Sequence, residues 1–160
     1  MLRMVPKTFS WTLSVMDGAE PVAQAVNVSW WKDKAEINLQ GATYIARREG
    51  VMSGAYLLES PTGVVARATK PSVWRRSLIV EHAGRTYTLG PASAWRREFV
   101  LFEGSTRIGS ISPESMFTRR AVVDLPPSVP FIAQVFIIWL TATLWKHDEA
   151  SGTAGAAAAG

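Results

Sequence analysis

The sequence predicts a mainly β protein: a closed antiparallel barrel of about 11 to 12 strands that is filled by a C-terminal hydrophobic helix. Three observations lead to this fold class. A pattern of 43 residues occurs three times. Each copy contains short strand-like segments that are separated by turn residues. The chain then enters an apolar run from Phe131 to Trp145.

The repeat is visible as similar residues that stand 43 positions apart. The pair Val22-Ala23 recurs as Val65-Ala66 and again as Ile108-Gly109. Further sets with the same spacing are Val15, Leu58 and Leu101; Trp31, Trp74 and Phe117; Ile37, Val80 and Val123; Gly41 and Gly84; and Tyr44 and Tyr87. Because equivalent positions of a repeat have equivalent surroundings, we expect Val65 and Ile108 to be buried and to face inward.

Each copy is expected to form four short strands, except that the third copy has room for only three. The expected strands are 9–16, 22–29, 35–39 and 43–48 in the first copy; 55–59, 64–69, 77–82 and 85–89 in the second; and 98–102, 107–112 and 119–125 in the third. Residues 2–5 are a candidate for a twelfth strand. Turn-forming residues such as Asp17-Gly18, Gly84 and Gly104 separate the segments.

The run from Phe131 to Trp145 is apolar on every side of a helix, so it has to be buried on every side. Only Gln134, Thr141 and Thr143 interrupt it. A bilayer-spanning helix needs about 20 apolar residues, so we favour a helix at 129–147 that is enclosed by protein. A barrel of about 12 strands is wide enough to need filling, and we therefore place this helix inside it.

The chain is expected to form one domain at 9–147, because its 160 residues are enough for a single substantial core. An N-terminal extension or edge strand at 1–8 precedes this domain, and a disordered tail at 148–160, rich in Ala and Gly, follows it. A β-trefoil also contains three four-stranded repeats, but it has no place for an all-apolar helix. The N-terminal residues lack the features of a secretory signal, so we expect a cytoplasmic protein.

The sequence carries no motif that is typical of catalysis or of metal binding. It has no cysteine, and its two histidines, His82 and His147, lack metal-ligand spacing. Neither a glycine-rich phosphate loop nor a nucleophile elbow is present. We therefore expect a non-enzymatic protein that uses no cofactor and no metal.

Basic and tryptophan residues gather at one end of the predicted barrel. In an antiparallel meander, successive turns alternate between the two ends, so the turns between second and third strands share an end with the connections between copies. The residues assigned to this end are Trp30, Trp31, Lys32, Lys34, Arg47, Arg48, Trp74, Arg75, Arg76, Trp95, Arg96, Arg97, Arg119 and Arg120. They include ten of the 17 lysines and arginines, whereas Asp17, Glu20, Glu59 and Glu103 are assigned to the opposite end.

This pattern predicts a binding surface for an anion, such as an anionic phospholipid or a membrane surface. Arginine binds phosphate through paired hydrogen bonds, tryptophan favours membrane–water interfaces, and the net charge of +4 favours anionic partners. A protein partner is an alternative, and nucleic acid is less expected because no RNA-binding signature accompanies the basic residues. Two other functions stay open: a membrane protein anchored by 131–145, and a scaffold without a small ligand. The same residues also fit solvated turns.

The layout resembles the tubby C-terminal-like superfold, which includes tubby domains, phospholipid scramblases and the plant LURP-one-related proteins. The resemblance covers 9–147. It rests on the repetitive barrel layout and on the run from Phe99, through the arginine-rich hairpin, to the segment PFIAQVFIIWLTATLW. It implies a barrel around a central helix and, from tubby domains, phosphoinositide binding. No ligand-binding residue of the family can be assigned to a position in this chain.

Overall fold

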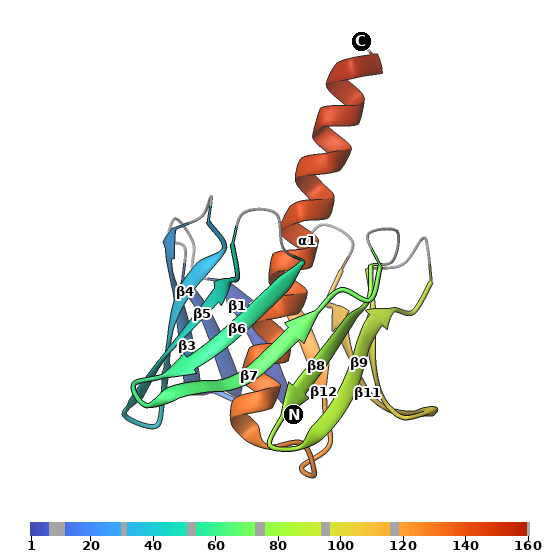
Figure 1. Cartoon of the computed structure of the whole chain (residues 1–160). Helices are drawn as coiled ribbons and strands as arrows, with labels where there is room; N and C mark the ends of the chain where they lie inside the picture. The colour runs from blue at the N-terminus through green and yellow to red at the C-terminus, as the bar shows by residue number, and fades with distance from the viewer. Residues whose placement is uncertain are drawn as a thin grey trace.

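The computed structural model describes residues 1–6, 12–29, 32–50, 54–72, 76–93, 97–115 and 119–159, with the backbone alone for 27–29 and 153–159. In these residues twelve strands form a closed barrel around a helix, α1 (Figure 1). The strands are β1 (Leu2–Pro6), β2 (Thr12–Asp17), β3 (Glu20–Ser29), β4 (Lys34–Leu39), β5 (Ala42–Arg48), β6 (Ala55–Ser60), β7 (Gly63–Thr69), β8 (Leu78–His82), β9 (Arg85–Pro91), β10 (Phe99–Glu103), β11 (Thr106–Pro113) and β12 (Ala121–Asp124).

Every strand pairs antiparallel with its neighbours along the chain, and β1 closes the ring by pairing with both β2 and β12. This confirms the predicted closed antiparallel barrel and its twelfth strand. The N-terminal residues are not an edge strand, because β1 is hydrogen-bonded on both sides. Closure of this kind removes the unpaired strand edges at which chains otherwise aggregate.

The repeat seen in the sequence corresponds to a β-bulge that recurs every 43 residues. Strand pairing skips Val22 in β3, Val65 in β7 and Ile108 in β11. A bulge leaves its extra residue unpaired and changes which residue points inward. The expectation that Val65 and Ile108 are buried is therefore wrong: both pack against the core but are only half-buried, whereas the next residue in β7, Ala66, is 2% exposed.

The residue after each bulge is small, namely Ala23, Ala66 or Gly109. At Gly109 the reason is a close approach by the chain that leads into the helix. A Cβ atom added there would lie 2.5 Å from the carbonyl oxygen of Asp124 and 2.9 Å from Cδ2 of Leu125. The third copy therefore needs glycine where the first two carry alanine.

β1 takes the place of the fourth strand that the third copy lacks. In the first two copies a tyrosine of the fourth strand lies opposite Ile37 or Val80. In the third copy Leu2 of β1 lies opposite Val123, the equivalent position of β12. The barrel therefore consists of three four-stranded units, and the two ends of the wall meet in the last of them.

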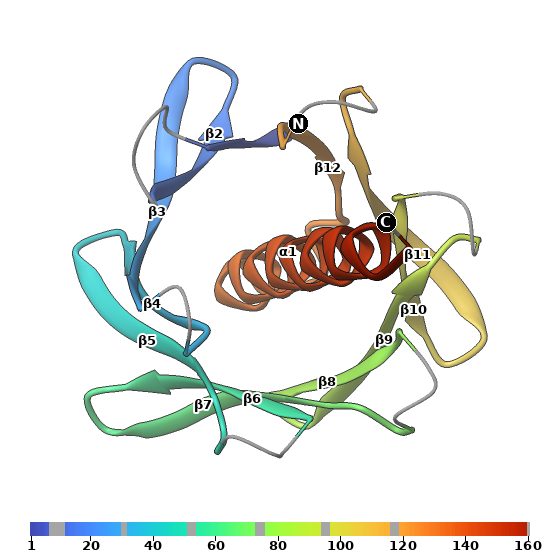
Figure 2. The same cartoon turned by 90° about the horizontal axis from the view of Figure 1, so that it is seen from above.

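The helix α1 (Phe131–Ala159) runs through the barrel (Figures 1 and 2). Every residue from Ala133 to Thr141 is buried. This stretch makes about two and a half turns, so the strands cover all sides of the helix. Tyr56 of β6, for example, packs edge-on against Trp139, with 5.9 Å between the ring centroids. The structure thus confirms the predicted central helix.

The polar side chains within this buried part of α1 bond to backbone carbonyl groups. Nε2 of Gln134 donates to the oxygen of Val129 at 2.8 Å and to that of Pro126 at 3.2 Å. The hydroxyl of Thr141 donates to the oxygen of Ile137 at 2.9 Å. These bonds avoid the cost of burying an unpaired polar group.

The helix is longer than the sequence predicted. It begins at Phe131 rather than at 129, and it continues beyond His147 to Ala159 instead of giving way to a disordered tail at 148–160. Its last turns extend past the strands (Figure 1). Gly152 and Gly155 suggested an end because glycine is a poor helix former. In the part of the chain that the structure describes, no helix has both the length and the apolar character needed to cross a bilayer.

Candidate functional site

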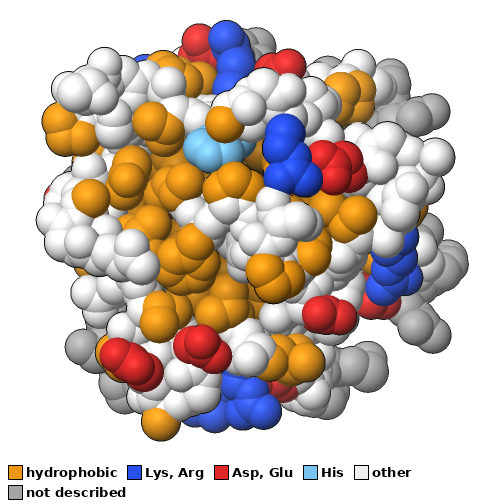
Figure 3. All heavy atoms as spheres, turned by 90° about the horizontal axis from the view of Figure 1, so that it is seen from below, with side chains coloured by type: hydrophobic (Ala, Val, Ile, Leu, Met, Phe, Trp, Pro, Cys, Tyr) orange, Lys and Arg blue, Asp and Glu red, His pale blue; other side chains and the backbone are white. Residues whose placement is uncertain are grey.

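The two open ends of the barrel differ. We call the end from which the C-terminal part of α1 emerges the upper mouth, and the other end the lower mouth (Figure 1). Asp17, Glu20 and Glu103 lie at the lower mouth, as predicted, and Glu59 lies one residue before the lower end of β6. Apolar side chains cover much of the face of this mouth (Figure 3). Arg85 also lies at this end and pairs with Glu103 at 2.9 Å. Those of the predicted anion-binding basic residues that the structure describes belong to the upper mouth.

The structure describes eight of the predicted site residues, and all of them lie on upper-mouth connections or at the strand ends beside them. They are Lys32, Lys34, Arg47, Arg48, Arg76, Arg97, Arg119 and Arg120. The other predicted site residues, Trp31, Trp74, Arg75, Trp95 and Arg96, lie outside the described residues, as does Trp30.

Arg47 is bound to the outer surface of the barrel. Its neighbour Ala46 faces the core, so Arg47 points outward. Its guanidinium makes two bonds to Glu59, Nε to Oε2 at 3.1 Å and Nη2 to Oε1 at 2.8 Å. These bonds raise the pKa of Arg47 and lower the pKa of Glu59. Arg47 therefore belongs to the wall of the barrel rather than to an anion site at the mouth.

Three residues at equivalent positions of the repeat surround α1 at the upper mouth: Asp33, Arg76 and Arg119, at intervals of 43 residues. We call these three the collar. Two positions after each collar residue, the chain has a residue that faces the core: Ala35, Leu78 and Ala121, respectively. Each collar residue bonds to a residue of opposite charge in the helix segment Lys146-His147-Asp148-Glu149.

Asp33 binds the basic part of this helix segment. Its carboxylate forms an ion pair with Nζ of Lys146, and Nε2 of His147 lies 2.8 Å from its Oδ2. Burial, the largest single influence, raises the pKa of Asp33. The hydrogen bonds from His147 and Lys146, together with their charges, outweigh burial and leave the pKa of Asp33 below its usual value. The carboxylate is therefore ionised at neutral pH although only 4% of its side chain is exposed.

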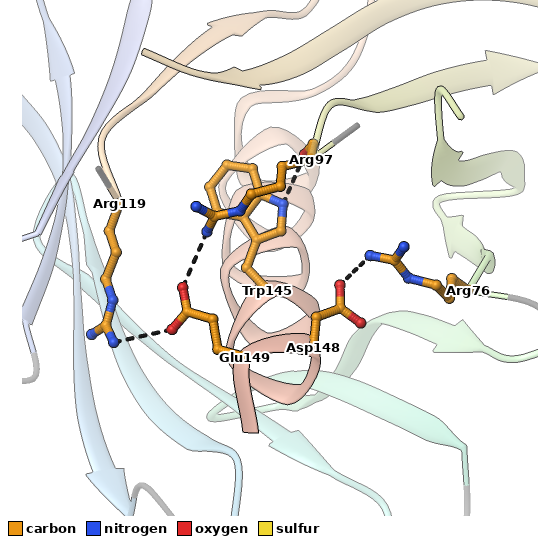
Figure 4. A network of polar contacts seen from close by, with 6 residues as sticks. All are labelled: Arg76, Arg97, Arg119, Trp145, Asp148 and Glu149. Carbon is orange, nitrogen blue, oxygen red and sulfur yellow. Dashed lines mark hydrogen bonds and ion pairs between the residues drawn. The ribbon is translucent and has the colours of Figure 1, made fainter. Parts of the chain in front are cut away.

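The two arginines of the collar bind the acidic part of the helix segment (Figure 4). Arg76 forms an ion pair with Asp148. Nη2 of Arg119 lies 3.2 Å from Oε2 of Glu149, and Nη2 of Arg97 lies 3.2 Å from Oε1 of the same carboxylate. Both oxygens of Glu149 are thus bound by guanidinium groups that come from two separate connections.

Arg97 is held in place by Trp145. The indole Nε1 of Trp145 donates to the carbonyl oxygen of Arg97 at 2.8 Å. The guanidinium of Arg97 lies 5.1 Å from the centroid of the indole, a distance at which a cation is attracted to the ring. Because Trp145 is itself buried in the barrel, it gives the guanidinium a fixed support.

The ion pairs of Asp148 and Glu149 are partly exposed, whereas Asp33 is buried. The side chains of Arg76, Arg97 and Arg119 are 40%, 31% and 57% exposed. Exposed pairs of this kind contribute at most about 1 kcal/mol each, because water and salt screen them. The guanidinium groups of the upper mouth can therefore exchange one anionic partner for another at little cost.

Asp33→Asn is expected to lower the free energy of unfolding by about 2–4 kcal/mol, because it takes the negative charge away from a largely buried ammonium group, that of Lys146. Urea denaturation at neutral pH measures this loss. Asp17→Asn serves as the control, since this exposed carboxylate at the lower mouth should matter by less than about 0.5 kcal/mol. Equal effects of the two substitutions would contradict a stabilising role for Asp33.

The effect of Asp33→Asn should depend on pH. The pKa of Asp33 is lower in the folded chain than its usual value of 3.8, which stands for the unfolded chain. The stabilisation is therefore complete above that value and is lost as the pH falls through the lowered pKa. We expect the difference between wild type and variant to shrink below about pH 4. A constant difference down to lower pH would show that the charge of Asp33 is not its source.

No protein-family model matches this chain, and neither a curated protein nor a solved structure matches it. The resemblance to the tubby-like superfold therefore stays a prediction.

The sequence pattern predicts the basic residues of the upper mouth but not their acidic partners. Asp148 and Glu149 fall in the segment for which the sequence predicts a disordered tail, and Asp33 belongs to none of the predicted sites. Two signals point to them. Asp33 has the same phase in the repeat as Arg76 and Arg119, and the helix segment at 146–149 presents two basic residues followed by two acidic ones.

Proposed function

We propose that the upper mouth is a non-catalytic binding surface for the phosphate-bearing headgroup of an anionic phospholipid, which brings this protein to a membrane surface. The observation that carries the proposal is the position of the Glu149 carboxylate between Arg97 and Arg119. The upper mouth already binds an anionic group with two guanidinium groups.

A phosphate group suits this arrangement. It presents several oxygens to surrounding donors, and guanidinium groups bind phosphate and carboxylate oxygens through similar charge-assisted hydrogen bonds. The support of Arg97 by Trp145 orients one of the two guanidinium groups before any ligand arrives. Such preorganisation lowers the cost of binding.

Further basic residues surround the same mouth. Lys32 and Lys70 are exposed on two of its connections, and Arg120 is exposed beside Arg119. Basic residues near an anionic leaflet contribute about 1 kcal/mol each to membrane binding. The lower mouth, with its acidic and apolar side chains, lacks this concentration of positive charge among the described residues.

The double substitution Arg119→Ser with Arg120→Ser tests the proposal. Loss of two basic residues should weaken binding to phosphatidylcholine vesicles that contain phosphatidylserine by roughly 10- to 30-fold in a co-sedimentation assay. Wild-type binding should weaken as salt is added, and vesicles of phosphatidylcholine alone should retain little protein.

The matched control is Arg3→Ser with Arg67→Ser, which removes the same charge from exposed arginines on the strands. This control should bind the anionic vesicles almost as well as wild type. Equal losses in the two double variants would show that only the net charge matters. Equal retention of wild type on neutral and anionic vesicles would contradict the proposal.

A further inference from the structure

We infer that Asp148 and Glu149 act as a built-in competitor that occupies the anion-binding guanidinium groups of the upper mouth until an anionic ligand displaces them. This inference rests on the proposed function and adds its regulation. The carboxylates of Asp148 and Glu149 accept hydrogen bonds from the guanidinium groups that a headgroup phosphate needs.

The contacts show direct competition rather than mere proximity. Nη2 of Arg119 and Nη2 of Arg97 are each bonded to an oxygen of Glu149, and Nη2 of Arg76 is bonded to Asp148. A phosphate oxygen cannot accept these hydrogen bonds while a carboxylate oxygen accepts them. The five side chains of this group carry three positive charges and two negative ones. The ligands that bind best are therefore those with several negative charges, or a dense anionic surface.

The acidic side chains can leave without opening the barrel. The helix is fixed just before them, because Leu144 and Trp145 are buried and Asp33 binds both Lys146 and His147. Asp148 and Glu149 are the next residues, and their side chains are 40% and 44% exposed. Rotation of exposed side chains is fast and needs no change in the backbone. Displacement therefore exposes the arginines while the fold stays intact.

The double substitution Asp148→Asn with Glu149→Gln removes the competitor and keeps the size of both side chains. We expect this variant to bind phosphatidylcholine vesicles that contain phosphatidylserine roughly three- to tenfold more tightly than wild type, because three weak ion pairs no longer compete with the ligand. Thermal unfolding should show that both proteins are folded at the assay temperature.

The matched control is Asp17→Asn with Glu20→Gln, which raises the net charge by the same amount at the lower mouth. It should bind the vesicles like wild type. A second arm of the experiment uses inorganic phosphate in solution at constant ionic strength. If the headgroup phosphate is what the arginines recognise, free phosphate should also bind more tightly to the Asp148→Asn, Glu149→Gln variant.

The outcomes separate this inference from the proposed function. Tighter binding by the Asp148→Asn, Glu149→Gln variant alone, which we call the upper-mouth variant, supports the inference. This holds even where the wild-type protein binds too weakly to detect. Binding of wild type, upper-mouth variant and control with one affinity overturns the inference and leaves the proposed function standing. Equal gains in the upper-mouth variant and the control also overturn it, because net charge would then explain both. Failure of all three proteins to bind vesicles and phosphate overturns both.

Discussion

Ile138→Asp is expected to unfold the whole protein. Ile138 lies in the middle of the buried part of α1 and is fully inaccessible to solvent. A carboxylate at this position would be surrounded by apolar side chains of the strands and of the helix itself. Burying an uncompensated charge costs several kcal/mol, a large share of the about 5–15 kcal/mol by which a domain of this kind is stable. Circular dichroism and thermal denaturation of the purified protein measure the loss.

Two further variants make this result interpretable. Ile138→Leu keeps the apolar volume and should cost less than about 1.5 kcal/mol. A chain that ends at Pro127 lacks the helix altogether and should fail to fold, because the strands would then enclose an empty space. A truncated chain that stays folded and melts cooperatively would contradict the view that the helix forms the core of the barrel.

Removal of residues 1–6 should have the second largest effect. The deletion takes away β1, which is hydrogen-bonded to both β2 and β12. It opens the barrel, creates two unpaired strand edges and removes the buried side chain of Met4. We expect a loss of at least about 4 kcal/mol, together with self-association through the open edges, measured by denaturation and by analytical ultracentrifugation.

Arg3→Ala is the control for this deletion. Its side chain is 60% exposed, and its substitution leaves the backbone pairing of β1 intact. It should change stability by less than about 0.5 kcal/mol. A deletion variant that remains monomeric and melts like wild type would show that β1 is dispensable and that three complete four-stranded units are not required.

Much of the fold could be predicted because its signals are local and periodic. The spacing of Val22, Val65 and Ile108 revealed three equivalent units, and the apolar character of Phe131–Trp145 on every side required enclosure. The shortage of one strand in the third unit pointed to residues 2–5. These inferences need only the pattern of apolar and turn residues along the chain.

The rest depends on contacts that such patterns do not show. A bulge in β7 leaves Val65 unpaired and only half-buried, which simple alternation along a strand does not predict. The extension of α1 past Gly152 contradicts the intrinsic preference of glycine. The ion pair between Asp33 and Lys146 joins residues 113 positions apart, and sequence reasoning from nearby residues cannot detect it.

We propose that the upper mouth binds anions through Arg76, Arg97 and Arg119. NMR signals of the arginine Nε–H groups, followed while potassium phosphate replaces potassium chloride at constant ionic strength, test it most directly. We expect the signals of these three arginines to shift and reach a plateau, while those of Arg3 and Arg67 on the outer surface of the strands stay in place. Signals of the three arginines that do not move, or equal shifts of all arginines without a plateau, would contradict it.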